Sequence, residues 1–182
     1  MQFTRRAALA GVAAAAATGF NPLSVSESRA QTAGSSTTGV YRYKFGDGEI
    51  IQLLDGARTF PMPEKFVANV SKEEAAAAYE GLYMPKGQVT ISFSPLIVNM
   101  GGKVIAIDTG NGLGANAATK GAVGNTRHNM AAAGIDPKSV DIVLISHFHG
   151  DHINGLKNAD GSPAYPNAEI KVPAAEQAFW TD

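Results

Sequence analysis

One short run of the sequence gathers most of the side chains that bind metals. The run His147-Phe148-His149-Gly150-Asp151-His152 contains three of the chain's four histidines and one aspartate. Neutral imidazole nitrogens and carboxylate oxygens suit zinc and related divalent ions. His147 and His149 are two residues apart, so they project to the same side of an extended segment. The adjacent Asp151 and His152 point in different directions. This spacing favours two ions, one held by each pair.

Two such ions would define the chemistry of the run. Divalent ions held a short distance apart can share a hydroxide, which is a nucleophile at neutral pH. Asp151 would then be both a metal ligand and the partner of that nucleophile. The alternative is a solvated histidine-rich loop, or histidines that only form hydrogen bonds. A cluster this compact, directly after an apolar strand, disfavours that alternative.

The residues before the run predict the element that positions it. Residues 141–146 are apolar, rich in β-branched side chains and short, which is typical of a buried strand. The cluster therefore lies at the carboxyl end of a strand, where open α/β sheets place their ligand sites. Gly150 and Gly155 permit the tight backbone path by which neighbouring side chains converge.

The rest of the chain alternates strands and helices. The Ser71-Lys72-Glu73-Glu74 sequence resembles a capping box that opens a helix ending near Gly81, and Gly101-Gly102 predicts a hairpin turn. We expect irregular structure over 60–70 and a glycine-rich loop over 109–124. His128 is expected to be exposed on a helix and not to bind metal. The expected strands are 41–45, 49–54, 89–93, 96–100, 103–108 and 169–172, and the expected helices are 71–81, 126–133 and 174–180, with a short turn from Pro137.

Composition limits the class of protein. The 182 residues are 45% hydrophobic and carry a formal net charge of -1, which suits one globular domain. A near-neutral charge gives no support for binding nucleic acid or an anionic membrane. The chain contains no cysteine, so disulfides and thiolate zinc ligands are excluded and any metal site must use His and carboxylate.

The first thirty residues are typical of an export signal. Thr4-Arg5-Arg6 precedes an alanine-rich apolar stretch, and Ser28-Arg29-Ala30 offers small residues where a signal peptidase cleaves. The paired arginines resemble a twin-arginine signal. We therefore predict a signal peptide over 1–30, a flexible Ser/Thr/Gly-rich lead-in over 31–39 and a domain over 40–182. The apolar stretch is too short for a stable membrane span, so the mature protein is expected to be periplasmic or secreted.

The metal run and four other segments resemble a known family. The His-x-His-x-Asp-His pattern is similar to the metal-binding signature of the metallo-β-lactamase fold superfamily. Residues 104–110, which end in Asp-Thr-Gly, resemble the family's upstream strand, and residues 46–56 resemble its opening hairpin. With Tyr165-Pro166-Asn167-Ala168 and Phe179-Trp180, they are most similar to the branch containing methyl parathion hydrolase and related exported lactonases.

The resemblance implies a fold and further site residues. The family fold is an α/β sandwich of αββα type, in which two sheets are flanked by helices. Asp108 would hold the metal-ligand loop in place without binding the metal, and Trp180 would line the substrate pocket. The second half of the family fold supplies a further His, a bridging Asp and a final His. No histidine follows His152, so we expect this chain to supply about the first half of a longer protein, rather than to be a degenerate relative.

Three functions are compatible with these observations. The first is a metal-dependent hydrolase with two divalent ions, zinc in the first place and iron or manganese as alternatives, acting on small-molecule lactones, esters or organophosphorus esters. The second is a single-iron dioxygenase on the same fold; di-iron oxygen reductases carry Glu at the position of His149. The third is a non-enzymatic or vestigial metal-binding module. The isolated chain is expected to be inactive, and the sequence leaves its oligomeric state open.

Overall fold

The computed structural model describes residues 39–182. The predicted signal peptide over 1–30, and the lead-in over 31–39 except Gly39, lie outside the described residues. No helix within residues 39–182 is long and apolar enough to cross a bilayer.

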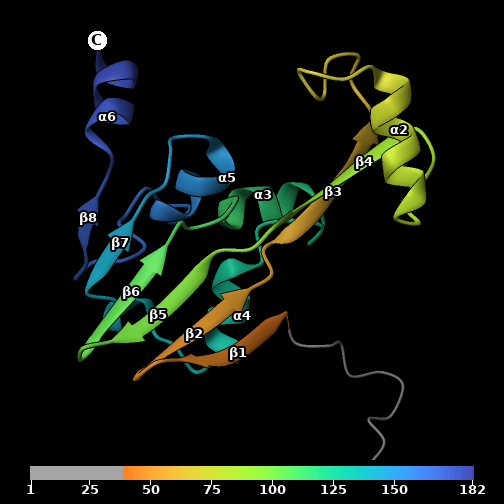
Figure 1. Cartoon of the computed structure of the whole chain (residues 1–182). Coiled ribbons are helices and arrows are strands. Elements are labelled where there is room, and N and C mark those ends of the chain that lie inside the picture. Colours follow the sequence, from red (N-terminus) through yellow and green to blue (C-terminus); the bar gives the residue numbers. More distant parts are fainter. Residues whose placement is uncertain (1–38) are drawn as a thin grey trace, which may run out of the picture. The chain divides into compact units, whose positions relative to one another are not determined.

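A six-stranded sheet forms the centre of the domain (Figure 1). Its first four strands pair antiparallel, and the last two join in parallel. The neighbouring parallel strands end at the same edge of the sheet, which is where ligand sites of such sheets form. In sheet order the strands are β1 (Val40–Phe45), β2 (Gly48–Leu53), β5 (Leu96–Met100), β6 (Lys103–Ile107), β7 (Ile142–Leu144) and β8 (Glu169–Lys171).

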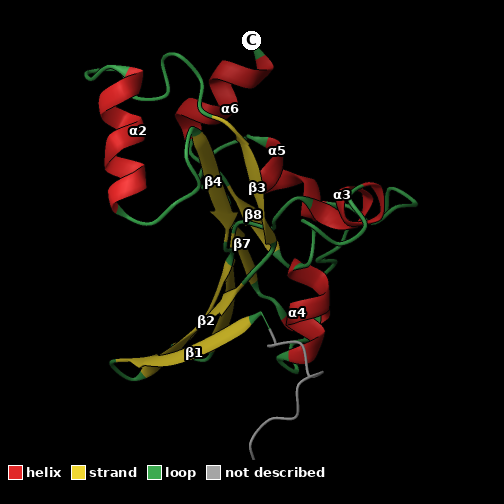
Figure 2. Cartoon of the chain, turned by 90° about the vertical axis from the view of Figure 1, so that its right-hand side faces the viewer, coloured by secondary structure: helices red, strands yellow, loops and turns green. Residues whose placement is uncertain are grey.

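Helices cover one face of this sheet and form the core with it (Figure 2). The residues Ile51, Ile97, Ala106 and Val143 pair in one row across four strands, and all are buried. They pack with Met130 of α4 (Thr126–Ala132). Two further short helices lie near the site edge, α3 (Gly112–Ala118) and α5 (Gly150–Ile153).

The opposite face of the sheet, here called the open face, is apolar but not buried. The neighbouring row across the sheet is Tyr43, Ile50, Val98, Ile105 and Ile142, and none of the five is buried. Successive strand residues point to opposite faces, so these side chains point away from the core. Strands that are apolar on both faces are typical of sheets covered on both sides. The open face is therefore of the kind that a further layer covers in such sheets.

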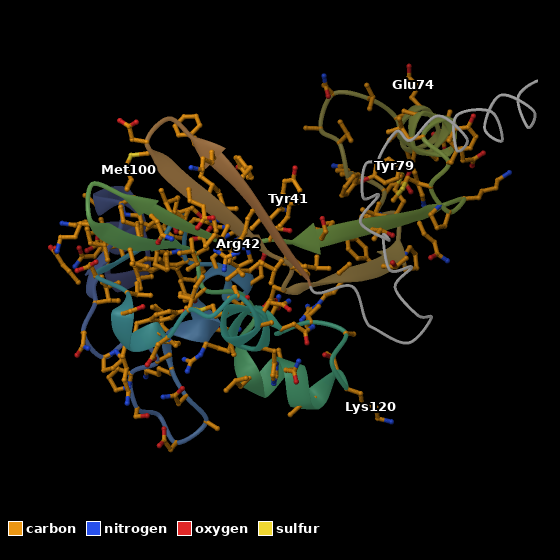
Figure 3. The ribbon with its side chains drawn as sticks, turned by 90° about the horizontal axis from the view of Figure 1, so that it is seen from below. Tyr41, Arg42, Glu74, Tyr79, Met100 and Lys120 are labelled. Carbon is orange, nitrogen blue, oxygen red and sulfur yellow. The ribbon has the colours of Figure 1, made fainter. Side chains whose placement is uncertain are left out.

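Strand β1 shows the two faces at one edge of the sheet (Figure 3). The guanidinium of Arg42 donates to the carbonyl oxygen of Ala133, at the end of α4, so Arg42 lies on the helix side. Tyr41 is 65% exposed and contacts the ring of Tyr43 at a centroid distance of 5.8 Å. These two tyrosines extend the apolar open face to the sheet edge.

A smaller unit, here called the arm, comprises residues 56–93. Its strands β3 (Gly56–Pro61) and β4 (Gln88–Phe93) form a separate antiparallel pair, and α2 (Lys72–Gly81) packs at its end (Figure 1). The predicted capping box is confirmed: the Glu74 N–H donates to Ser71 Oγ, and the Ser71 N–H donates to Glu74. Met62, Ala75 and Val89 form a small core of their own.

Several element predictions need correction. Strand β3 was not predicted, and it includes Phe60 and Pro61, which were assigned to irregular structure. The glycine-rich segment contains α3. Strand β7 has three residues instead of six, and Leu144 is 42% exposed because only one face of the sheet is covered. The remaining predicted elements agree within a few residues, including η1 (Pro137–Ser139) and α6 (Ala174–Thr181), whereas α5 and η2 (Asn154–Leu156), within and after the histidine run, were not predicted.

Candidate metal centre

The site lies where the chain leaves two adjacent parallel strands. Ile107 of β6 pairs with Leu144 of β7, and the Asp108 N–H donates to the Leu144 carbonyl oxygen at 2.9 Å. The segments that follow the two strands, one beginning at Asp108 and the other holding the histidine run, therefore start side by side. The predicted position of the run after a strand is confirmed.

The structure brings the three imidazoles of the run together. The ring centroids of His147 and His149 are 4.7 Å apart, and those of His147 and His152 are 3.8 Å apart. His149 precedes α5, whereas Asp151 and His152 lie on it. The turn depends on Gly155, because a Cβ there would lie 2.1 Å from the carbonyl oxygen of Thr109. By the distance between ring centroids, His147 lies nearer to His152 than to His149, although the sequence spacing had paired it with His149.

Asp108 connects the two segments. Its carboxylate accepts from the Ser146 N–H and hydroxyl, each at 2.8 Å, and lies 2.8 Å from His152 Nδ1. The φ angle of Asp108 is 58°, in the left-handed region that few residues other than Gly, Asn and Asp adopt. These contacts are those expected of a residue that holds the metal-ligand loop, and that role remains a prediction.

The position of His152 tests whether a cation fits here. Its Nδ1 faces Asp108, and its Nε2 lies 3.1 Å from Asp151 Oδ2. A neutral imidazole has one N–H and can donate to only one of these carboxylates. If the proton of His152 is on Nδ1, the lone pair of Nε2 faces a lone pair of Asp151 Oδ2 with no hydrogen between them. A cation bound between these two atoms satisfies both. Two ligands of one zinc ion, each at about 2.1 Å, lie roughly 3.4 Å apart, so this separation fits a shared ion.

The donor set is nevertheless incomplete as it stands. Within residues 39–182, no three His, Asp or Glu side chains are arranged so that they could hold a metal ion together. The donor types and the His152–Asp151 separation fit a divalent ion. A complete metal site would need these side chains to reorient, or further ligands from outside residues 39–182.

A cavity of about 200 Å³ opens beside these side chains. Asp108, Asp151 and His152 form one wall, and the end of the arm with the residues after it forms the other. The second wall alternates apolar and hydroxyl side chains, namely Ile91, Ser92, Phe93, Ser94 and Pro95. A molecule held in this cavity would contact the proposed ligands on one side and a largely apolar surface on the other.

Asp55, which was not among the predicted site residues, organises the loops under the site. Asp55 is fully buried, and its carboxylate accepts from Asn111, Gly124 and Thr126. Asn111 belongs to the segment that follows Asp108. The sequence signal that could have indicated Asp55 was a charged residue directly after a predicted buried strand. A carboxylate that is buried at such a place requires several hydrogen bonds. Sequence alone could not indicate which donors it meets.

Two other aromatic or imidazole residues lie apart from the cavity. Trp180 is 54% exposed and does not line the cavity beside Asp151. Its Nε1 donates to Glu176, and its ring contacts Phe179 edge to face. The prediction that Trp180 contacts substrate remains untested. His128 is exposed on α4, as predicted.

Comparison with known proteins gives a consistent result. The profile of the Metallo-beta-lactamase superfamily matches residues 88–178, half of the chain. The solved structure of hydrolase AbOPH, described as a member of the beta lactamase superfamily, is 32% identical, has a TM-score of 0.69, and covers 81% of this chain and 48% of its own. AidC, described as a dizinc quorum-quenching lactonase, has a TM-score of 0.70 at 24% identity over 79% of this chain and 48% of its own, which supports the fold alone.

A curated relative matches a shorter segment. Ribonuclease Z of Clostridium perfringens is 38% identical over 63 residues, or 35% of this chain and 16% of that protein. The two solved structures extend well beyond the match, so this chain spans about half of their length. The predicted α/β fold class is confirmed by these likenesses.

Proposed function

This chain belongs to the metallo-beta-lactamase superfamily, and from that membership we propose that the whole protein is a metal-dependent hydrolase. The observation that supports the proposal most is the gathering of three imidazoles and one carboxylate beside a cavity. When bound, two divalent ions would supply a nucleophilic hydroxide at neutral pH and polarise the bond under attack. Zinc is the preferred metal because the donors are imidazole and carboxylate, and AidC is described as a dizinc enzyme.

The residues of this chain have distinct parts in the proposal. His147 and His149 hold one ion, and Asp151 and His152 hold the other. Asp108 fixes the tautomer of His152 by accepting from its Nδ1, as carboxylates commonly do behind a metal-bound histidine. By the same contact with Ser146, Asp108 keeps the start of the histidine run against β6.

The cavity wall favours an uncharged substrate. Among the described residues that line it, none is Lys or Arg, and two are aspartates. The lining therefore offers no basic side chain to the backbone phosphates of RNA, whereas a neutral lactone, carboxylic ester or organophosphorus ester would pack its apolar part against Ile91, Phe93 and Pro95. We therefore propose neutral small-molecule esters as the substrate class, in preference to nucleic acid.

The rest of the protein would complete both the sheet and the site. The open face is of the kind that a further layer covers, and the donors of residues 39–182 do not complete two metal shells. A second half of the polypeptide would supply both. We also propose that the protein is exported to the periplasm or secreted, on the signal-like sequence of residues 1–30.

The test is the metal content and activity of the whole protein and of two histidine variants. Wild type should bind two divalent ions per chain, measured by plasma mass spectrometry, and hydrolyse a lactone, an aryl ester or a phosphotriester. His149→Ala should lose bound metal and activity, whereas His128→Ala, an exposed histidine on α4, should retain both. Full activity in His149→Ala would refute the proposal. One iron per chain with oxygen consumption would indicate the dioxygenase, and bound metal without turnover would indicate a binding module.

A further inference from the structure

The last described helix contacts the metal run through one side chain. Helix α6 has no buried residue, yet the carboxylate of its Glu176 accepts from the Phe148 N–H at 2.9 Å. Phe148 lies between His147 and His149, so this bond fixes the peptide unit that links His147 to Phe148, within the segment that joins two proposed ligands. The Phe148 ring packs against the main core, and the residue is therefore held from both ends.

The Glu176 carboxylate is itself fixed in place. The same Oε2 atom accepts from Trp180 Nε1 at 3.1 Å, one helical turn further along. The hydrogen bond from Phe148 lowers the pKa of Glu176, and the Trp180 bond and the nearby imidazoles of His147 and His149 lower it further, against the effect of burial. Glu176 therefore places a negative charge beside the two imidazoles at neutral pH.

A negative charge at this position favours a cation on the neighbouring ligands. Carboxylates that surround metal ligands orient them and raise their affinity for the metal. Asp108 has this arrangement at His152, on the β6 side of the run. Glu176 acts differently on the α6 side: it accepts from the backbone N–H between His147 and His149, and its charge acts on their imidazoles without a direct hydrogen bond to either ring.

We propose that Glu176 is a positioning residue of the metal centre, which holds the backbone between His147 and His149 and increases the metal affinity of that pair. This inference rests on the proposed function, because it requires that these histidines bind a metal. It gives Trp180 a role different from the predicted pocket contact: the indole N–H orients Glu176.

The test compares zinc affinity among variants of the whole protein, measured by competition with a chromogenic chelator. Glu176→Ala removes both the acceptor and the charge, and should weaken zinc binding by about 10- to 100-fold. Glu176→Gln keeps an acceptor without the charge and should fall between Glu176→Ala and wild type. Trp180→Phe removes only the second donor and should have a smaller effect. Glu169→Gln, at an exposed carboxylate on β8 paired with Lys171, should match wild type.

Thermal unfolding of the metal-free variants separates positioning from stability. Metal-free Glu176→Gln should melt with wild type, although it binds zinc more weakly. Zinc affinity in Glu176→Gln and Glu176→Ala equal to that of wild type, while His149→Ala loses zinc, would overturn this inference and leave the proposed function intact. Wild-type zinc binding in His149→Ala would overturn the proposed function itself.

Discussion

Replacing Asp55 by asparagine should destabilise the protein far more than an ordinary loss of one charge. The buried Asp55 carboxylate accepts five hydrogen bonds: two at Oδ1, both from Thr126, and three at Oδ2, from Asn111 and Gly124. An asparagine can place its NH₂ at only one of these positions. The less costly orientation puts NH₂ at the Oδ1 position, where the Thr126 hydroxyl can turn to accept. The Thr126 backbone N–H then loses its partner.

The magnitude follows from these bonds. One buried N–H without a partner costs about 1–3 kcal/mol, and each bond that changes from a charged to a neutral acceptor loses about 1 kcal/mol. Relief from burying a charge offsets part of this loss. We expect Asp55→Asn to reduce the free energy of unfolding by about 2–4 kcal/mol. With a urea slope near 2 kcal/mol/M, the midpoint should fall by about 1–2 M.

The measurement is urea unfolding of the metal-free whole protein, followed by circular dichroism. The matched control is Asp160→Asn, because Asp160 is an exposed carboxylate whose hydrogen bonds within residues 39–182 are to Ser162 in its own turn. The control should move the midpoint little. A midpoint for Asp55→Asn equal to that of the control would refute the view that Asp55 holds these loops together.

Four other predictions follow from the structure and the sequence. Gly155→Ala should destabilise the protein by about 1–3 kcal/mol, because its Cβ would meet the Thr109 carbonyl. Gly114→Ala in α3 should stabilise it by about 0.5–1 kcal/mol, because a Cβ there meets nothing within 4 Å. Equal melting temperatures of the two variants would contradict this prediction. Burial raises the pKa of Tyr165 to about 12, so the unfolded chain ionises first, and stability that is intact below pH 10 should be lost as the pH rises to about 12. Phenolate absorbance should show Tyr165 ionising after the exposed tyrosines, and simultaneous ionisation in the folded protein would count against it. The isolated 182-residue chain should be poorly soluble and inactive because its open face is uncovered, and the natural mature protein should begin at Gln31 and have a mass above that of residues 31–182. A monodisperse, cooperatively melting monomer of the isolated chain with two bound metals would contradict the first of these expectations.

The sequence predicted most of the elements whose signals are local. The capping box at Ser71, the Gly101-Gly102 turn and the strand before the histidine run depend on neighbouring residues, and each is present. Strand β3 was missed because it is formed by pairing with β4, in which Gly56 lies opposite the distant Phe93. Pairing with a distant segment leaves no local pattern in the sequence. Helix α3 was missed because glycines disfavour helices locally, and tertiary contacts overcame that preference.

The same distinction applies to the candidate site. The types and spacing of His147, His149, Asp151 and His152 indicated metal chemistry directly, and the family resemblance added Asp108. Asp55 and Glu176 were not found. Their partners lie far along the chain: Asp55 bonds to Thr126, and Glu176 bonds to the peptide of Phe148. Neither contact leaves a periodic pattern or a fixed spacing in the sequence.

The sequence by itself determined the donor atoms, because side-chain chemistry and short spacing are properties of neighbouring residues. Only the tertiary structure decided which carboxylates support those donors, since Asp108 reaches His152 through the parallel pairing of β6 and β7. It also decided that one face of the sheet is buried and the other open, although both rows of strand residues are equally apolar. That difference depends on where the helices pack, which is a contact between distant parts of the chain.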